Sequence, residues 1–239
     1  MCGRFAMTLP PEAVRAFFAY VEQPNFPPRY NIAPTQPIPL VAARGGERHF
    51  MLARWGFLPG FVKDPKDFPL LINARAETLA EKPSFRAALR RRRCLIVADG
   101  FYEWRRAAPE AGRTAPRAPY LVRRVDRAPM GFAGLMETWS DPSGGEIDTA
   151  CIVTTPANRL MALIHDRMPA ILLPDAFAIW LDNERVDAST ARALLNPAPE
   201  AALELVPIGP AINRADNDAP ATQAPIGEAI RAAPTAKPG

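Results

Sequence analysis

The stretch that decides the fold runs from residue 94 to residue 104 and reads Cys94-Leu95-Ile96-Val97-Ala98, Asp99-Gly100, Phe101-Tyr102-Glu103-Trp104. Its first five residues are continuously apolar, which predicts a strand buried on both faces. We expect this strand to continue past Asp99-Gly100 into the aromatic segment. Alternation along a strand would then place Phe101 and Glu103 on one face and Tyr102 and Trp104 on the other.

Further strand patterns lie on both sides of this stretch. Residues 37–43 and 48–55 flank Arg44-Gly45-Gly46-Glu47, which predicts a β-hairpin with a Gly-Gly turn. Many strands in hairpins with a few peripheral helices predict an α+β fold with mainly antiparallel pairing. The other expected strands are 120–125, 130–139, 147–155, 170–173 and 203–207, and the expected helices are 10–20, Ser84 (as N-cap) to Arg90, 158–164, 175–181 and 188–195.

Length and composition favour one compact domain. The chain has 239 residues, of which 48% are hydrophobic, so it can bury a sizeable core. No linker is long enough to divide it, and we expect a single domain over residues 1–225 followed by a loose, Ala/Pro-rich tail over 226–239. Residues 105–118 are rich in Ala, Pro, Arg and Gly, which predicts a long exposed hairpin loop.

The positive charge of the chain comes almost entirely from arginine. The formal net charge is +4, and only Lys63, Lys66, Lys82 and Lys237 are lysines. Arginine suits bidentate contacts with phosphate, so the composition mildly favours an anionic partner, although a GC-rich genome would give the same bias. The run Arg90–Arg93 has two interpretations: a helix C-terminus that attracts cations, or a phosphate contact.

Cysteine and hydropathy patterns exclude several classes of protein. The three cysteines, Cys2, Cys94 and Cys151, are odd in number and widely spaced, so neither a disulfide framework nor a zinc site is indicated. We expect no metal and no cofactor. No apolar stretch reaches transmembrane length and no secretory signal opens the chain, which favours a reducing, cytoplasmic location.

The first four residues, Met1-Cys2-Gly3-Arg4, carry a distinct chemical possibility. If Met1 is removed, Cys2 presents an α-amine and a thiol two carbons apart. Such a pair can condense with an aldehyde to an imine and then close a thiazolidine ring, an intramolecular step with little entropy cost. Both groups are partly in their reactive forms near neutral pH. The alternative is that Cys2 is an ordinary second residue.

Two further residues are candidates for proton transfer. His165 follows an expected helix and precedes Asp166 and Arg167, where a histidine can exchange protons near pH 7; a structural role is the alternative. Glu103 lies between two aromatics that could desolvate it and raise its pKa. Strand alternation by itself favours an outward-facing glutamate. The other histidine, His49, is explained by an exposed strand position.

Binding groups can also be read from the pattern. Asn73, Arg75 and Glu77 alternate after an apolar run, so Asn73 could bond a sugar hydroxyl and Arg75 a phosphate. Trp55 ends a hairpin strand, where it could stack on a nucleic-acid base. The alternative for Trp55 is an ordinary core tryptophan.

Taken together, five blocks resemble the signature of the SOS response-associated peptidase family, also called abasic site processing proteins. The resemblance extends from Cys2 to about Pro225, and it favours the chemical interpretation of Cys2 and Glu103. Departures are small, such as Phe57 where leucine is more usual and Val97 where proline is common. The blocks are Met1–Arg4, Tyr30–Gln36, Asn73–Thr78, Gly100–Trp104 and His165–Pro169.

This resemblance implies a barrel-like antiparallel sheet and a specific activity. Met1 would be removed with the help of the domain itself, and Cys2 would form a thiazolidine with the ring-opened aldehyde of an abasic site in single-stranded DNA. The crosslink would protect the lesion during the DNA damage response. Asn73 would position the sugar and the N-terminus, Glu103 would act as acid and base, and His165 would assist proton transfer.

The same resemblance indicates where DNA would bind. Arg4, Arg75 and Arg167 match positions near DNA phosphates, and we expect Trp55 and Trp104 to add stacking surface. We expect a monomer that acts on single-stranded DNA in the cytoplasm, at the nucleoid after damage, and that contacts no membrane.

Two alternatives to this lyase-like crosslinking activity stay open at the level of sequence. One is a thiol peptidase or hydrolase that acts in trans and uses Cys2, His165 and Asn73 as nucleophile, base and orienting group. It needs the thiol alone, whereas a thiazolidine needs a free amine as well. The other is a single-strand binding module without catalysis, for which Cys2 would be dispensable.

Overall fold

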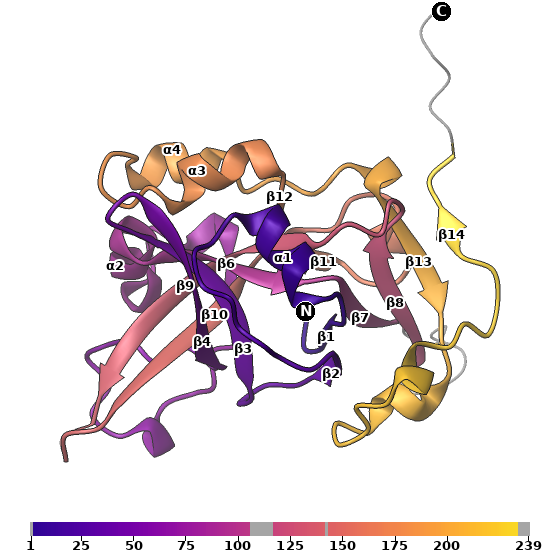
Figure 1. Cartoon of the computed structure of the whole chain (residues 1–239), viewed down its shortest axis with the longest axis horizontal. Helices are drawn as coiled ribbons and strands as arrows, with labels where there is room; N and C mark the ends of the chain where they lie inside the picture. The colour runs from indigo at the N-terminus through magenta and orange to yellow at the C-terminus, as the bar shows by residue number, and fades with distance from the viewer. Residues whose placement is uncertain (1, 106–116, 142, 234–239) are drawn as a thin grey trace, which may run out of the picture.

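A closed barrel of five strands forms the centre of the molecule. In this computed structural model, which describes residues 2–105, 117–141 and 143–233, the barrel strands follow the order β10, β4, β3, β6 and β9, and β9 pairs with β10 to close the ring (Figure 1). The α+β class with a mainly antiparallel, barrel-like sheet is therefore confirmed. The barrel strands are β3 (Pro37–Arg44), β4 (Glu47–Trp55), β6 (Arg93–Ala98), β9 (Met130–Ser140) and β10 (Glu146–Pro156).

Short strands extend this sheet around β10 and β9. Strand β5 (Asn73–Arg75) runs parallel to β10, and β11 (Arg167–Pro169) pairs antiparallel with the end of β10. Strand β12 (Ile171–Leu172) pairs with β9. The sequence analysis expected one strand at 170–173 and no strand at β5, because three-residue strands are too short to show a period.

A second sheet carries the N-terminus. Its order is β14, β13, β8, β7, β1 and β2, so the chain's first strand lies beside the aromatic segment that follows Gly100. Register pairs Phe5 with Phe101 and Ala6 with Gly100. The strands are β1 (Phe5–Met7), β2 (Arg29–Ile32), β7 (Gly100–Arg105), β8 (Ala118–Arg124), β13 (Leu203–Pro207) and β14 (Ile230–Arg231).

The expectation of one strand running through Asp99-Gly100 is wrong. Strand β6 belongs to the barrel and β7 to the second sheet, and the chain changes sheets at Asp99. The Asp99 carboxylate accepts hydrogen bonds from the Thr8 hydroxyl at 2.8 Å and the Leu9 N–H at 2.9 Å. A Cβ at position 100 would lie 2.7 Å from Leu121 Cδ1, so glycine permits the close approach of β8.

Helices cover one end and one side of the sheets. The helix α1 (Pro11–Phe18) buries Val14 and Phe18, as its spacing predicts. The helix α2 (Pro83–Arg91) begins at a proline and has Lys82 as its N-cap, so the N-cap expected at Ser84 is wrong. Proline already has the helical φ of a first position and therefore starts the helix two residues earlier than expected. The remaining helices are α3 (Phe177–Leu181) and α4 (Ala188–Ala193), with a 3-10 turn at Met161–Leu163 in place of the helix expected over 158–164.

The arginine run Arg90–Arg93 begins in the last turn of α2, and its members differ in burial. Arg93 is fully buried and donates to the carbonyl oxygens of Trp180 at 2.7 Å and Leu89 at 2.8 Å. Its other donors reach Asp182 O and Val186 O, so one guanidinium joins the C-terminal ends of α2 and α3. Arg90 and Arg91 remain exposed. The structural interpretation therefore holds for Arg93.

The C-terminal segment is more ordered than its composition suggests. Residues 226–233, expected to be loose, include β14, which pairs with β13. Glu204, which is fully buried, accepts from Arg231 at 2.7 Å and Arg123 at 2.9 Å, and also pairs with Arg127. Three arginines around one buried carboxylate hold the segment in place. The loop expected at 105–118 lies mostly outside the described residues. None of the helices in the described ranges is long and apolar enough to cross a membrane.

Candidate active site

Cys2 lies inside the molecule, directly ahead of β1. Its side chain is fully buried, and its thiol donates to the carbonyl oxygen of Arg4 at 3.7 Å. The side-chain amide of Asn73 donates to the Cys2 carbonyl oxygen at 2.9 Å. Because β5 is held against β10, Asn73 reaches Cys2 from the barrel side. The expected partnership of Asn73 with the N-terminal segment is thus present in the geometry.

Glu103 faces the same interior from β7. Only 3% of it is exposed, so the outward orientation that alternation favours is wrong. Both faces of β7 are covered, because Phe101 packs in the main core while Tyr102 packs in a second cluster with Ile212. Burial raises the pKa of the Glu103 carboxyl above its ordinary range.

The cysteine and the glutamate affect each other electrostatically. Burial raises the pKa of the Cys2 thiol well above its ordinary value, and the nearby negative charge of Glu103 raises it further. The thiol is therefore held in its protonated form in the chain that retains Met1. A positive charge on a new α-amine at Cys2 would act in the opposite direction.

His165 approaches Glu103 from the segment that leads into β11. Its Nε2 lies 3.9 Å from Glu103 Oε2. Its Nδ1 accepts from the Arg167 N–H at 3.0 Å and also lies 3.0 Å from the Asp166 carboxylate. The backbone donor favours the neutral tautomer that carries its proton on Nε2, towards Glu103. The neighbouring carboxylate stabilises the protonated imidazolium. His165 is thus placed to exchange a proton with Glu103.

Buried polar atoms around this cluster lack partners. In the part of the chain that the structure describes, Asn73 Oδ1, Thr155 Oγ1 and Arg167 Nε are buried without a hydrogen bond. These atoms come from β5, β10 and β11, which pair side by side. Unsatisfied polar atoms are costly inside a protein and are concentrated where a polar ligand completes them. The three atoms lie on neighbouring strands, and one of them belongs to Asn73, whose amide contacts Cys2.

The guanidinium of Arg167 is already engaged. It forms a bidentate pair with the Glu77 carboxylate at 2.5 and 3.0 Å and donates to Thr154 O at 2.7 Å. This pairing orients Arg167 and limits what remains for a phosphate. Sequence reasoning did not identify Glu77 as a site residue, although it alternates with Asn73 and Arg75 in the same block.

Arg4 and Trp104 lie together beside the C-terminal segment. The Arg4 guanidinium sits 6.0 Å from the centre of the Trp104 ring and donates to Asn31 Oδ1 at 2.9 Å and Ile212 O at 2.9 Å. The Trp104 indole N–H donates to Asn213 Oδ1 at 2.7 Å. Both side chains are partly exposed, so they form a cationic and aromatic surface next to Glu103.

The remaining predicted residues divide between surface and core. Arg75 is exposed on β5, two positions beyond Asn73. Trp55 is fully buried, and its indole N–H donates to Ile72 O at 2.9 Å. Trp55 has no surface on which a base could stack, so the alternative of a core tryptophan applies. Across the described ranges, no group of three or more His, Cys, Asp or Glu side chains is placed to hold a metal ion.

Comparisons with known proteins place this geometry in context. The family described as SOS response associated peptidase (SRAP) matches residues 1–215. The chain is 36% identical over 223 residues to the abasic site processing protein YoqW of Bacillus subtilis (strain 168), across 92% of this chain and 97% of that protein. It is 30% identical over 271 residues to the abasic site processing protein HMCES of Xenopus tropicalis, across 95% of this chain and 78% of that protein.

A solved structure agrees with the fold. The crystal structure of a protein from Bacteroides thetaiotaomicron superposes with a TM-score of 0.82 at 25% identity and covers 93% of this chain and 98% of that one. The overall fold is therefore shared with that protein.

Proposed function

This chain belongs to the SOS response associated peptidase family, and from that premise we propose that it processes abasic sites in DNA by forming a covalent crosslink through Cys2. The crosslink joins the N-terminal cysteine to the ring-opened aldehyde of the lesion in single-stranded DNA. Met1 is removed first, by the same site. The names of the relatives YoqW and HMCES support the substrate class.

One observation carries the proposal: the second residue of the chain is a buried cysteine whose carbonyl is held by Asn73, with Glu103 and His165 beside it. An ordinary second residue has no reason to lie among a buried carboxylate, an imidazole and unsatisfied polar atoms. Such a set costs stability and is found where chemistry needs it.

The chemistry balances with the groups at hand. Hydrolysis of the Met1–Cys2 bond consumes one water and releases methionine and a free amine. That amine attacks the aldehyde carbon and forms a carbinolamine, which loses water to give an imine. The thiol sulfur then bonds to the imine carbon while the nitrogen takes a proton, which closes the thiazolidine ring. Crosslink formation therefore releases one water overall and needs no oxidant or reductant.

Each neighbouring side chain has a defined part. Glu103, with a pKa raised by burial, can keep its proton at higher pH and deliver it to the departing hydroxyl of the carbinolamine. His165 returns that proton across the 3.9 Å separation. Asn73 fixes the Cys2 backbone with its amide N–H, and its unpartnered Oδ1 accepts from a sugar hydroxyl or from the new amine.

The DNA strand lies over the neighbouring surface. Arg4 and Arg75 contact phosphates, Trp104 offers a stacking face, and Arg167 contributes its remaining Nε donor. Because an abasic site has no base to read, binding rests on phosphates and stacking and weakens with salt. We infer that the protein acts as a monomer on DNA in the cytoplasm.

The test is a denaturing gel of purified protein mixed with single-stranded DNA that carries one abasic site. We expect a band that survives denaturation with the wild type and disappears with Cys2→Ala. The matched control is Cys151→Ala, because Cys151 is an equally buried free cysteine that lies in β10 and has no part in the proposed chemistry. Absence of a covalent species at every pH and salt concentration would contradict the proposal.

A blocked N-terminus separates crosslinking from hydrolysis in trans. A variant with a non-cleavable extension before Cys2 retains the thiol and loses the free amine. Crosslinking should then vanish. A peptidase that uses the thiol alone would keep its activity against peptide substrates, and that result would favour the hydrolase.

A further inference from the structure

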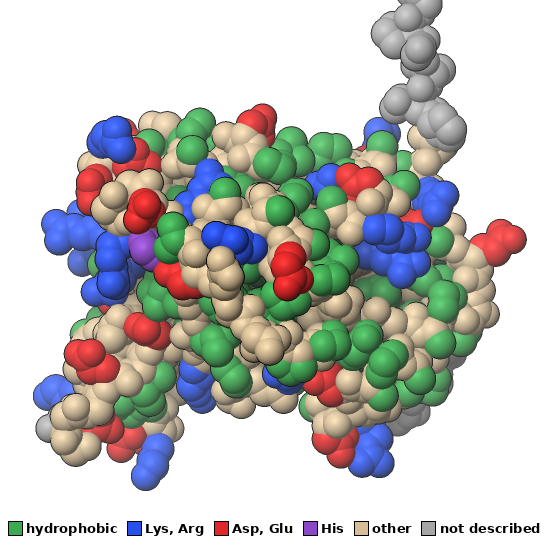
Figure 2. All heavy atoms as spheres, viewed as in Figure 1, with side chains coloured by type: hydrophobic (Ala, Val, Ile, Leu, Met, Phe, Trp, Pro, Cys, Tyr) green, Lys and Arg blue, Asp and Glu red, His purple; other side chains and the backbone are tan. Residues whose placement is uncertain are grey.

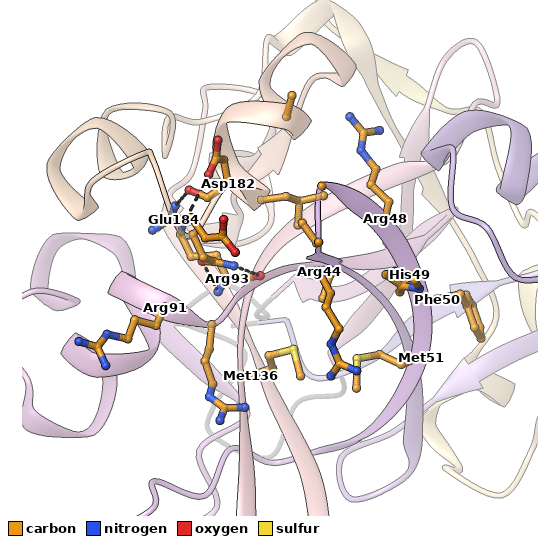
Figure 3. A pocket seen from close by; sticks show the side chains of 18 of the residues that line it. Arg44, Arg48, His49, Phe50, Met51, Arg91, Arg93, Met136, Asp182 and Glu184 are labelled. Atoms are coloured by element: carbon orange, nitrogen blue, oxygen red, sulfur yellow. Dashed lines mark hydrogen bonds between the residues drawn. The ribbon is translucent and has the colours of Figure 1, made fainter.

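A second polar region lies at the other end of the barrel from Cys2. A groove of about 920 Å³ opens between the tip of the β3–β4 hairpin and the ends of α2 and α3 (Figure 3). At the opposite end of β4, Trp55 bonds to the residue before Asn73. The two ends of β4, Glu47 beside the hairpin tip and Trp55 beside the site, lie about 26 Å apart along the strand at roughly 3.3 Å per residue.

The groove is strongly cationic. Figure 2 shows Lys and Arg side chains gathered at the left of the molecule, where the β3–β4 hairpin and α2 lie in Figure 1. Three carboxylates, Glu22, Asp182 and Glu184, line the groove against six arginines. Those arginines are Arg44, Arg48, Arg91, Arg92, Arg93 and Arg185.

Several of these arginines already have partners. Arg93 donates to the carbonyl groups at the ends of α2 and α3, and Arg48 donates to the Phe18 carbonyl oxygen at 2.9 Å. Arg185 pairs with Asp182 at 3.2 Å, and Arg92 pairs with Glu137 at 3.0 Å. Glu22 is likewise engaged by His49 at 2.7 Å. These paired side chains form the walls of the groove. The charge available to a ligand therefore comes from the arginines whose side chains have no such partner.

Two arginines remain available at the rim. Arg44 and Arg91 are exposed, and within the described residues neither side chain has a hydrogen bond or an ion pair. They come from separate elements, the hairpin turn and the end of α2. The Gly45-Gly46 turn beside Arg44 has open space around both glycines, so the rim is accessible. Among the described residues that line the groove, Glu184 is the one exposed acid whose side chain has no hydrogen bond or ion pair.

The floor of the groove is apolar. Figure 3 shows Met51 and Met136 in the middle of the groove together with Arg44. Met136 is 8% exposed, while Met51 and Phe50 are partly exposed. Thioether and aromatic surfaces pack against sugars and bases, while arginine forks bind phosphate oxygens. A cationic rim over an apolar floor matches a nucleic-acid strand.

We propose that this groove is a second binding site for single-stranded DNA, in which Arg44 and Arg91 hold backbone phosphates of the strand whose lesion lies at Cys2. The choice of DNA as ligand rests on the proposed function. At roughly 3.4 Å per stacked nucleotide, the 26 Å along β4 corresponds to about eight nucleotides. A strand whose lesion lies at Cys2 therefore reaches the groove only if it is longer than that.

The test measures equilibrium binding of a fluorescent 25-nucleotide single strand without a lesion to the Cys2→Ser protein. We expect Arg44→Ala/Arg91→Ala to weaken binding about tenfold at low salt. Two lost phosphate contacts should also reduce the slope of log affinity against log salt by about 1.4. Glu184→Gln should tighten binding a few-fold, because it removes the exposed acid.

The matched control is Arg86→Ala/Arg192→Ala, which removes the same charge from exposed positions on α2 and α4 outside the groove. Equal loss in both double variants would contradict a specific groove. Competition by polyglutamate as strong as that by DNA would assign the groove to acidic polypeptides instead.

Failure of this inference can be told apart from failure of the proposed function. If the wild type forms the crosslink but Arg44→Ala/Arg91→Ala binds the 25-nucleotide strand normally, the groove proposal alone is wrong. If binding depends on the groove but no crosslink forms, the groove stands and the chemistry at Cys2 is wrong.

Discussion

The two ends of β4 present opposite kinds of polar surface. Near Trp55, the site around Cys2 is buried and contains a carboxylate and a thiol with raised pKa values and polar atoms without partners. Near Glu47, the groove is open and its free groups are exposed guanidiniums. Enclosure tunes proton affinity and so selects a reaction, whereas open charge selects a class of ligand and little else. We therefore assign the covalent chemistry to the site around Cys2 and affinity for DNA to the groove.

The largest effect is expected from replacing Cys2, which should affect the buried site and not the groove. Cys2→Ala should abolish the crosslink to abasic single-stranded DNA while leaving noncovalent affinity for intact DNA within about twofold. The thiol forms the bond, but it contributes nothing to phosphate binding. The measurement is a denaturing gel run alongside fluorescence anisotropy. A Cys2→Ala protein that still crosslinks would break the distinction between the two regions.

The next effect concerns Glu103. Glu103→Gln should slow crosslinking by about 10²–10⁴-fold, the usual contribution of a general acid. It should also raise the melting temperature, because the buried charge is removed. Since burial raises the pKa of Glu103 in the folded state, the wild type loses stability as pH rises from the ordinary carboxyl range through that raised value.

The stability difference between Glu103→Gln and wild type should therefore be near zero at about pH 4 and grow to roughly 2–4 °C at neutral pH. Thermal melts across pH check this, with Glu228→Gln as an exposed control. A difference that shrinks as pH rises would mean that the Glu103 charge is stabilised and not penalised by its surroundings.

Arg93 tests the architecture of the groove. Arg93→Ala should lower the free energy of unfolding by about 3–5 kcal/mol, because it leaves the buried carbonyl groups of two helix ends without donors. Arg90→Ala, three residues away and exposed, should change it by less than about 0.5 kcal/mol. Chemical denaturation measures both. Similar values for the two would show that Arg93 does not join α2 to α3.

Asp166 should give the smallest effect. Its carboxylate lies 3.0 Å from His165 Nδ1, but 86% of its side chain is exposed. Asp166→Asn should slow crosslinking about two- to threefold at low salt and alter its pH profile, because the protonated imidazole loses a stabilising charge. The difference should disappear at high salt, where exposed charges are screened. An equal loss at all salt concentrations would indicate a structural role for Asp166.

Local patterns in the sequence predicted most of the fold. The apolar run Cys94–Ala98 and the Gly-Gly hairpin are encoded by neighbouring residues, so their strands appear where they are expected. The burial of Glu103 could not be predicted from alternation, because both faces of β7 are covered: Phe101, on the side of Glu103, packs in the main core, and Tyr102 packs with Ile212, more than a hundred residues away. Strand alternation alone predicts that one side of β7 faces solvent.

Part of the site was also predictable from the sequence. Family blocks identified Cys2, Asn73, Glu103 and His165, and the structure brings these four together. Trp55 could not be assigned, because a tryptophan at a strand end is compatible with either core or surface. The four consecutive arginines Arg90–Arg93 cannot be told apart from the sequence. The packing of α3 distinguishes Arg93 from its neighbours.

The central claim is that Cys2 bonds to the lesion through both its amine and its thiol. It is tested most directly by the intact mass of the adduct formed, without reductant, with an oligonucleotide carrying one abasic site. The account predicts the mass of the chain without Met1 plus the oligonucleotide minus one water, with one thiol fewer available for alkylation than in the unreacted protein. An adduct that retains Met1, or one in which every thiol still reacts, would contradict it.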